Sequence, residues 1–247
     1  MLAVIGGSGM SRLAGLEVVE RRRVRTPYGE PSAALSFGRL GGRSLVFLAR
    51  HGDEHTLPPH QVNYRANLWA LRTCAPVGIV AVAAVGGIRS DLGPGDLVMP
   101  HQVIDYTWGR ESTYHQGPLS AVTHVDFTEP YDRDLRQQIA AAAAAIGVAI
   151  GGVAVYAATQ GPRLETAAEI DRLERDGADV VGMTGMPEAV LARELGIPYA
   201  AINVVANHAA GRGESREGVS MDAIHAVLDE AMLRVGAIIE RMLTSND

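Results

Sequence analysis

The chain has 247 residues, of which 47% are hydrophobic and 20% are charged, and its formal net charge at pH 7 is −6. This length and apolar content are sufficient for one large α/β domain with a sizeable core, which we expect to span residues 1–247. The negative net charge gives no reason to expect a nucleic-acid partner, since nucleic-acid binders usually carry a basic face.

The targeting and redox features of the chain are few. Its single cysteine, Cys74, excludes an internal disulfide and suits a reducing compartment. No apolar run reaches the length of about 18 residues that a membrane span needs. Met1–Ile5 lead directly into a glycine loop, without the basic flank or cleavage site of a signal peptide. We therefore expect a cytoplasmic protein with no membrane partner.

Short apolar runs alternate with amphipathic stretches along the chain. The near-continuous apolarity of residues 79–85 and 199–205 suits strands that are buried on both faces. We predict strands at Leu2–Ile5, Ser44–Leu48, Val77–Ala84, Leu97–Pro100, Val153–Ala158, Asp179–Gly182 and Tyr199–Val205. We predict helices at Tyr64–Arg72, Asp132–Ile146, Thr166–Arg175 and Pro187–Leu195, and a final helix that Ser220 caps and that continues to about Met242. The alternation predicts an α/β single domain with a central mixed β-sheet flanked by helices, although periodicity alone does not distinguish it from a Rossmann-like fold.

A glycine loop, Gly6-Gly7-Ser8-Gly9, directly follows the first predicted strand. Backbone N–H groups of such a loop can surround an anion, and the small side chains allow it to approach. Glycine-rich turns also open dinucleotide-binding folds, but no clean G-x-G-x-x-G and helix follow here.

A second polar segment, Arg50-His51-Gly52, ends what we predict to be the second strand. The guanidinium of Arg50 offers a fork of donors that suits a tetrahedral oxyanion. The alternative is a metal site that also uses His55 and His60, but Gly52 and the prolines after Leu57 indicate a loop rather than a helix with ligands one turn apart.

The segment Thr159–Thr166 joins a predicted strand to a predicted helix through Gly161-Pro162. The Gly-Pro pair predicts a turn that presents Leu164 and Glu165 at the carboxyl end of the strand, where ligands bind in open α/β sheets. A carboxylate beside an apolar residue can bind a planar polar ring by its edge and its face. The alternative is an ordinary loop with a solvated glutamate.

Together these motifs resemble the trimeric purine nucleoside phosphorylases, a family that includes the methylthioadenosine phosphorylases. The resemblance covers Ile5 to about Met242 and rests on separated motifs in family order. These are Gly6–Gly9, Arg50–Gly52, Asn63–Asn67, Gly95-Asp96, Gln160–Glu165, Gly177–Asp179, Met183-Thr184 and Pro187-Glu188. It implies a nucleoside phosphorylase-like fold and a reaction between a nucleoside and inorganic phosphate, with no cofactor and no metal.

The resemblance implies a phosphate site and a ribose contact. It assigns phosphate binding to Ser8, Arg50, His51 and Thr184, and it places Met183 under the ribose. Many relatives carry a hydroxyl near Ala83-Ala84, so this chain departs from the pattern and leaves backbone donors at Ala84 and Gly86. For Met183 the alternative is plain core packing.

The base pocket implied by the resemblance favours a 6-oxopurine. At two positions where the methylthioadenosine phosphorylases carry aspartates, this chain has Asn207 and Ala209 instead. Asn207 can donate to a 6-oxo group or to N7, and Glu165 accepts from the N1–H of a 6-oxopurine but repels the N1 lone pair of adenine. A turn-capping role is the alternative for Asn207.

The 5′ end is predicted to be apolar. Phosphorylases of ordinary nucleosides place a histidine near the position of Met221, whereas Met221 and Ile224 form one apolar face here. Such a face favours a methylthio group over a hydroxyl, unless both residues only pack in the core or His225 turns inward. The resemblance also implies a homotrimer in which His124 enters the 5′ pocket of a neighbouring subunit.

Combined, these features predict phosphorolysis of 5′-methylthioinosine, with Asn207 and Glu165 as the catalytic contacts to the purine. The alternatives are a general inosine/guanosine phosphorylase, a methylthioadenosine phosphorylase, and a non-catalytic nucleoside-binding protein.

Overall fold

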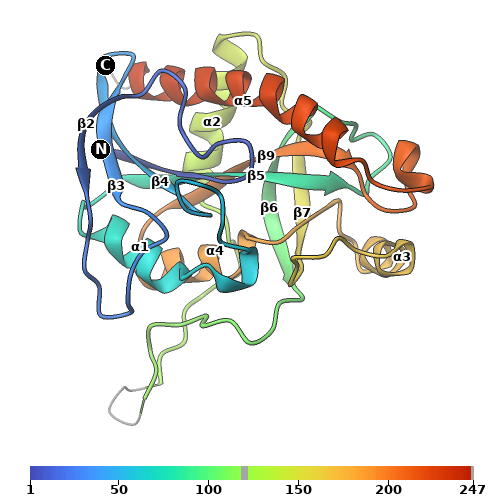
Figure 1. The fold of residues 1–247 in the computed structure, drawn as a ribbon, viewed down its shortest axis with the longest axis horizontal. Coiled ribbons are helices and arrows are strands. Elements are labelled where there is room, and N and C mark those ends of the chain that lie inside the picture. Colours follow the sequence, from blue (N-terminus) through green and yellow to red (C-terminus); the bar gives the residue numbers. More distant parts are fainter. Residues whose placement is uncertain (118–121, 246–247) are drawn as a thin grey trace.

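A nine-stranded mixed sheet organises the computed structural model, which describes residues 1–117 and 122–245 (Figure 1). Its strands are β1 (Leu2–Gly6), β2 (Glu17–Arg22), β3 (Leu35–Leu40), β4 (Arg43–Ala49), β5 (Gly78–Gly87), β6 (Leu97–Asp105), β7 (Val153–Ala158), β8 (Val180–Gly182) and β9 (Tyr199–His208). The order is β2-β3-β4-β1-β5-β8-β7-β6-β9, and β9 pairs with β5 as well as with β6. Strands β5, β8, β7, β6 and β9 therefore form a closed ring, to which β1, β4, β3 and β2 add an open wing.

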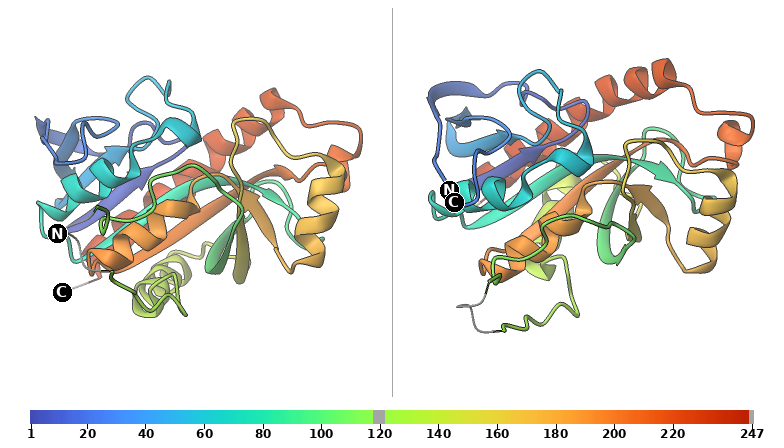
Figure 2. Two further views of the ribbon diagram at one scale, coloured as in Figure 1. Left: turned by 90° about the horizontal axis from the view of Figure 1, so that it is seen from below. Right: turned by 60° about the horizontal axis from the view of Figure 1, so that its bottom comes forward.

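Helices cover both faces of the sheet. They are α1 (Tyr64–Arg72), α2 (Arg133–Ala145), α3 (Ala167–Arg175), α4 (Gly185–Glu194) and α5 (Met221–Thr244). Helices α2 and α5 pack on one face of the sheet, and α1 and α4 pack on the other (Figure 1). Helix α3 stands at one end, over a smaller apolar cluster (Figure 2). None of the described helices is long and apolar enough to cross a membrane.

Side-chain caps explain where several helices begin. Ser220 accepts from the N–H of Ala223 at the start of α5, as its sequence predicts. Thr166 and Glu169 form a reciprocal capping box that starts α3 directly after the Gly161-Pro162 turn. These caps fix the points at which the chain leaves the loops around the sheet edge.

A register shift interrupts the long β5–β9 pair. Val85 lies opposite Val205, but Gly86 lies opposite Asn207, so Ala206 is an extra residue on β9. Such a bulge breaks the strict alternation of side chains along a strand. As a result both Ala206 and Asn207 reach the same cavity.

The predicted fold class is confirmed, and all seven predicted strands and five predicted helices are present. Two strands were missed, β2 and β3, so the strand before Arg50 is the fourth and not the second. Every residue of β2 is exposed, because this edge strand packs no apolar face against a layer. It therefore lacks the alternation that identifies a half-buried strand.

Candidate active site

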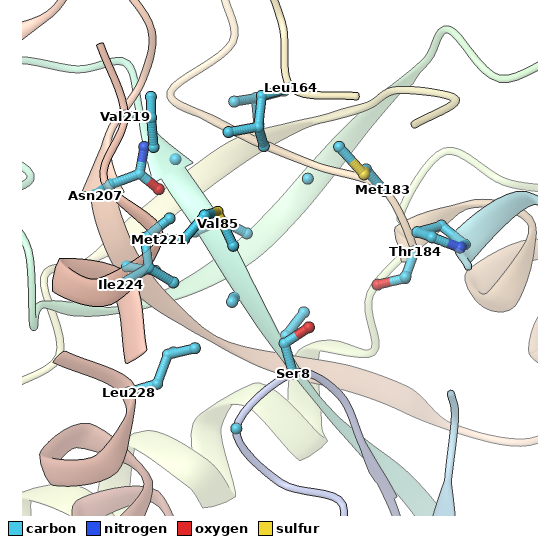
Figure 3. Close-up of a pocket in the computed structure, with 18 of the residues that line it drawn as sticks. Ser8, Val85, Leu164, Met183, Thr184, Asn207, Val219, Met221, Ile224 and Leu228 are labelled. Carbon is cyan, nitrogen blue, oxygen red and sulfur yellow. The ribbon is translucent and has the colours of Figure 1, made fainter. Parts of the chain in front are cut away.

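A cavity of about 570 Å³ opens at the sheet edge where most of the predicted site residues meet. Its walls come from the segments that follow β1, β4, β7 and β8, from the ends of β5 and β9, and from the first turns of α5. Figure 3 shows Ser8 and Thr184 at one end of this space and Leu164 at the other. Asn207, Val219, Met221, Ile224 and Leu228 lie along one side, and Met183 lies on the opposite side.

The glycine loop after β1 lies against the guanidinium of Arg50. A Cβ atom on Gly7 would lie 2.6 Å from Nη1 of Arg50 and 2.5 Å from the carbonyl oxygen of Val82. Gly9 has a φ of +79°, which favours glycine. The loop therefore needs glycine for close approach and for its turn, and it leaves the Ser8 side chain at the cavity.

A buried ion pair holds Arg50. Its Nε and Nη2 donate to the two carboxylate oxygens of Glu188 at 2.7 and 2.8 Å, and its Nη1 donates to the Val82 carbonyl at 2.9 Å. Burial opposes the charge of Arg50, but the Glu188 carboxylate outweighs it and raises the guanidinium pKa above its ordinary value. Three of the five N–H groups are thus engaged, and two remain to face a ligand.

His51 is the second buried polar residue of this end. Its Nδ1 is 2.8 Å from the carbonyl oxygen of Leu57. Burial, followed by the nearby positive charge of Arg50, lowers the pKa of His51 to about 4. The imidazole is therefore neutral at physiological pH.

Thr184 lies directly before α4, and its hydroxyl makes no capping bond to that helix. Its backbone N–H donates to the hydroxyl of Tyr156 at 3.2 Å. The Thr184 side chain lies at the cavity wall (Figure 3), where its hydroxyl also interacts with that of Tyr156.

At the other end, Glu165 is oriented by a neighbour. The hydroxyl of Thr159 donates to Oε1 of Glu165 at 2.6 Å. This bond occupies one carboxylate oxygen and leaves Oε2 as an acceptor for a ligand. Gly161 between them has a φ of +61°, and a Cβ there would lie 2.4 Å from the sulfur of Met183, so the turn packs directly on that residue.

The Asn207 side chain is held by a hydrogen bond from its carboxamide. Nδ2 donates to the backbone carbonyl of His208 at 2.6 Å. Since a carbonyl only accepts, this bond also sets which end of the amide is nitrogen. One N–H and the oxygen Oδ1 remain to meet a ligand.

The flank formed by α5 is mixed in character. Met221 is 53% exposed, whereas Ile224 is 8% exposed and belongs to the core cluster as well as to the cavity wall. His225 and His55 also line the cavity. The Nε2 atom of His55 lies 3.4 Å from the Ser8 hydroxyl.

Of the predicted site residues, twelve line the cavity: Ser8, Arg50, His51, Ala84, Gly86, Leu164, Glu165, Met183, Thr184, Asn207, Met221 and Ile224. His124 does not; it lies exposed in a segment away from this cavity. Among the residues that the structure describes, no three histidine, cysteine or acidic side chains are grouped so that they could hold a metal ion.

Sequence reasoning missed Arg110, which organises the wall from behind. Its Nη1 donates to the carbonyls of Met183 and Met186, both at 2.7 Å, and its Nη2 donates to that of Gln160 at 2.8 Å. It thereby joins the turn that carries Glu165 to the segment that carries Thr184. No motif identifies such a residue, because backbone carbonyls are the same in every sequence.

Strand-end loops and anion donors around one cavity are typical of an α/β enzyme that binds an anionic ligand, and comparison with known proteins gives the class. The family model described as "Phosphorylase superfamily" matches residues 1–244. The chain belongs to the phosphorylase superfamily and is an enzyme, a pentosyltransferase of the nucleoside phosphorylase class.

Individual relatives extend this result. A protein of Pseudomonas syringae pv. tomato named "Probable S-methyl-5'-thioinosine phosphorylase" is 50% identical over 244 residues, covering 99% of this chain and 98% of the relative. A Moorella thermoacetica protein named "Probable 6-oxopurine nucleoside phosphorylase" is 45% identical and covers 85% of this chain and 80% of its own. The structure of methylthioadenosine phosphorylase from Schistosoma mansoni with adenine superposes with a TM-score of 0.92 at 33% identity, covering 98% of this chain and 90% of that one.

Proposed function

We propose that the enzyme cleaves S-methyl-5′-thioinosine with inorganic phosphate, giving hypoxanthine and 5-methylthioribose 1-phosphate. The observation that carries the proposal is that Glu165 and Asn207 line the same cavity as the apolar Met221 and Ile224. The Pseudomonas relative, which covers nearly the whole chain, carries this activity in its name.

Selectivity for a 6-oxopurine follows from the free polar atoms at the base end. Oε2 of Glu165 accepts the N1–H of hypoxanthine, while the same oxygen faces a lone pair on N1 of adenine. The remaining N–H of Asn207 donates to O6, and Oδ1 accepts from N7–H. A 6-aminopurine would leave two polar contacts unpaired, which is the condition under which a site rejects an analogue strongly.

The 5′-methylthio group is proposed to lie against Met221 and Ile224. Burying a methyl and a sulfur against these side chains favours the thioether over a hydroxyl by the hydrophobic effect. Met183 packs against the ribose on the opposite side of the cavity, consistent with its place in Figure 3.

In the reaction the bond between C1′ and N9 of the purine breaks and a bond between C1′ and a phosphate oxygen forms. The electron pair of the broken bond goes to the purine, which takes up the one proton that hydrogen phosphate gives up when its oxygen bonds to C1′. Phosphate held by Ser8, Arg50, His51 and Thr184, with the backbone at Ala84 and Gly86, stabilises the positive charge that develops on the sugar. Asn207 and Glu165 stabilise the negative charge on the base, so catalysis rests on preorganised polar groups.

We further propose a cytoplasmic homotrimer that needs no cofactor beyond its co-substrate phosphate. The exposed position of His124, outside its own cavity, is compatible with its reaching the 5′ pocket of a neighbouring subunit. Partners are thus the nucleoside, phosphate and two further copies of the chain, with no nucleic acid and no membrane.

The test is phosphate-dependent release of base from methylthioinosine, inosine and methylthioadenosine at equal concentration. The proposal expects the fastest cleavage with methylthioinosine. Fastest cleavage of methylthioadenosine would contradict the base-pocket assignment, and the absence of any phosphate-dependent cleavage would contradict the activity as a whole.

A general 6-oxopurine nucleoside phosphorylase is the second candidate, because two histidines line the cavity beside its apolar side chains. His55 and His225 both line the cavity and offer polar contacts to a 5′-hydroxyl. Equal use of inosine and methylthioinosine would favour this candidate.

A further inference from the structure

His51 presents an acceptor, not a donor, to the phosphate site. Its Nδ1 lies 2.8 Å from the Leu57 carbonyl oxygen. A carbonyl oxygen only accepts, so the ring proton is on Nδ1, and in a neutral imidazole the other nitrogen, Nε2, then carries a lone pair.

The position of the ring makes Nε2 the atom that meets a ligand. His51 lines the cavity although only 6% of the residue is exposed. Within residues 1–117 and 122–245, Nε2 has no hydrogen-bonding partner, whereas Nδ1 is held by the loop that returns at Leu57.

The groups around the ring keep it neutral. Besides burial, the positive charge of Arg50 and the neighbouring His55 lower the pKa of His51. The His55 ring packs against the His51 ring with centroids 4.7 Å apart. Burial, Arg50 and then His225 lower the pKa of His55 in turn. The Glu188 carboxylate, which could offset these groups, is already bound by Arg50 and by the hydroxyl of Tyr199 at 2.8 Å.

Apart from His55, whose Nε2 lies 3.4 Å from the Ser8 hydroxyl, the other polar groups of this end can all donate a hydrogen bond. They are the two free N–H groups of Arg50, the hydroxyls of Ser8 and Thr184, and the backbone of the glycine loop. An anion bound here therefore meets, in Nε2 of His51, an atom that only accepts, among groups that can donate. Hydrogen phosphate satisfies that acceptor with its P–OH group, but sulfate has no proton at neutral pH.

We propose that Nε2 of His51 accepts the P–OH of hydrogen phosphate, and that the enzyme selects phosphate over sulfate by this contact. The inference rests on the proposed phosphate site. Sulfate enters only when His51 takes up a proton from solution, because otherwise two lone pairs face each other in a buried site.

The experiment measures the inhibition constant of sulfate against phosphate in methylthioinosine phosphorolysis from pH 6 to 8.5. The inhibition constant is expected to rise about tenfold per pH unit, the slope for uptake of one proton, while KM expressed for hydrogen phosphate stays nearly constant. A pH-independent sulfate constant equal to the phosphate KM would overturn the inference.

Two variants locate the proton. His51→Gln puts an amide donor near the position of Nε2, so the sulfate slope is expected to vanish and sulfate to bind as well as phosphate. His55→Gln, on the adjacent packed ring, is the matched control and is expected to retain the slope. If the slope vanishes in His55→Gln and persists in His51→Gln, the proton belongs to His55 and the inference is wrong.

A measurement on the unaltered enzyme covers the case in which His51→Gln does not fold. Calorimetric titration with sulfate in buffers of different ionisation enthalpy is expected to show uptake of about one proton at pH 8, and titration with phosphate close to none. No proton uptake with sulfate would overturn the inference while leaving phosphorolysis intact. Absence of phosphate-dependent turnover would instead overturn the proposed function.

Discussion

Replacing Asn207 by Asp is the most direct test of the base pocket. The amide nitrogen lies 2.6 Å from the His208 carbonyl oxygen, so in Asn207→Asp an oxygen at that place must carry a proton or move. The purine simultaneously loses the N–H that we assign to O6 and gains an acceptor for a 6-amino group.

The two exchanges set the expected size of the effect. Loss of the donor to O6 leaves a buried acceptor unpaired and costs about 1–3 kcal/mol, and the new bond to a 6-amino group contributes about 1 kcal/mol. Together they amount to about 2–4 kcal/mol, which is roughly 30-fold to 1,000-fold in the ratio of kcat/KM for methylthioinosine to that for methylthioadenosine. The shift should grow with pH, because only the ionised carboxylate loses the donor completely.

The assay is steady-state phosphorolysis of both nucleosides, together with thermal unfolding of the variant. Asn63→Asp is the matched control, since Nδ2 of Asn63 also donates to a backbone carbonyl, that of Tyr28 at 2.7 Å, but lies outside the cavity. Asn63→Asp should lose stability without a change in the substrate ratio. An unchanged ratio in a folded Asn207→Asp enzyme would refute the assignment.

Three further changes probe the remaining walls of the site. Thr159→Val removes the donor to Glu165 and should lower kcat/KM for methylthioinosine about fivefold, which corresponds to about 1 kcal/mol for one hydrogen bond. Thr159→Ser keeps the hydroxyl and should retain the parent kcat/KM. Equal loss in both variants would indicate a packing effect. Glu188→Gln leaves Arg50 buried without its carboxylate and should destabilise the fold by about 3–5 kcal/mol. The melting temperature should fall by roughly 6–20 °C. A melting temperature equal to that of the parent would contradict the buried pair. Met221→Ser should lower the preference for methylthioinosine over inosine about fivefold, whereas Leu233→Ser, on the same helix but outside the cavity, should leave that preference unchanged.

The buried strands and most of the site were predictable, because apolar runs and strand-end motifs are local in sequence. Glu165 follows β7 and Asn207 lies near the end of β9; both strands are mostly apolar, and such strands place their carboxyl ends at one edge. Strand β2 was not predictable in this way, since it is exposed along its whole length.

The supports of the site could not be read from the sequence. Arg50 and Glu188 are 138 positions apart, and nothing near either residue indicates that they meet in a buried pair. Arg110 binds mostly backbone carbonyls, and every residue type carries a backbone carbonyl, so the sequence does not indicate its partners. The hydrogen bond of Asn207 likewise goes to a carbonyl, so its fixed orientation became visible only in the structure.

The extra residue on β9 divides the strand into a part that pairs regularly in the sheet and a part that lines the cavity. Up to Val205 the strand is committed to the sheet, and its buried side chains tolerate little change. Beyond Ala206 its partners across the ladder are Gly86 and Gly87, which offer no side chains that must be matched. If the proposed base pocket is right, a substitution at Asn207 is therefore expected to alter which purine is accepted while the pairing of β9 up to Val205 is kept. In evolutionary terms, we expect such a bulge to allow a change of substrate by a few point mutations within one architecture.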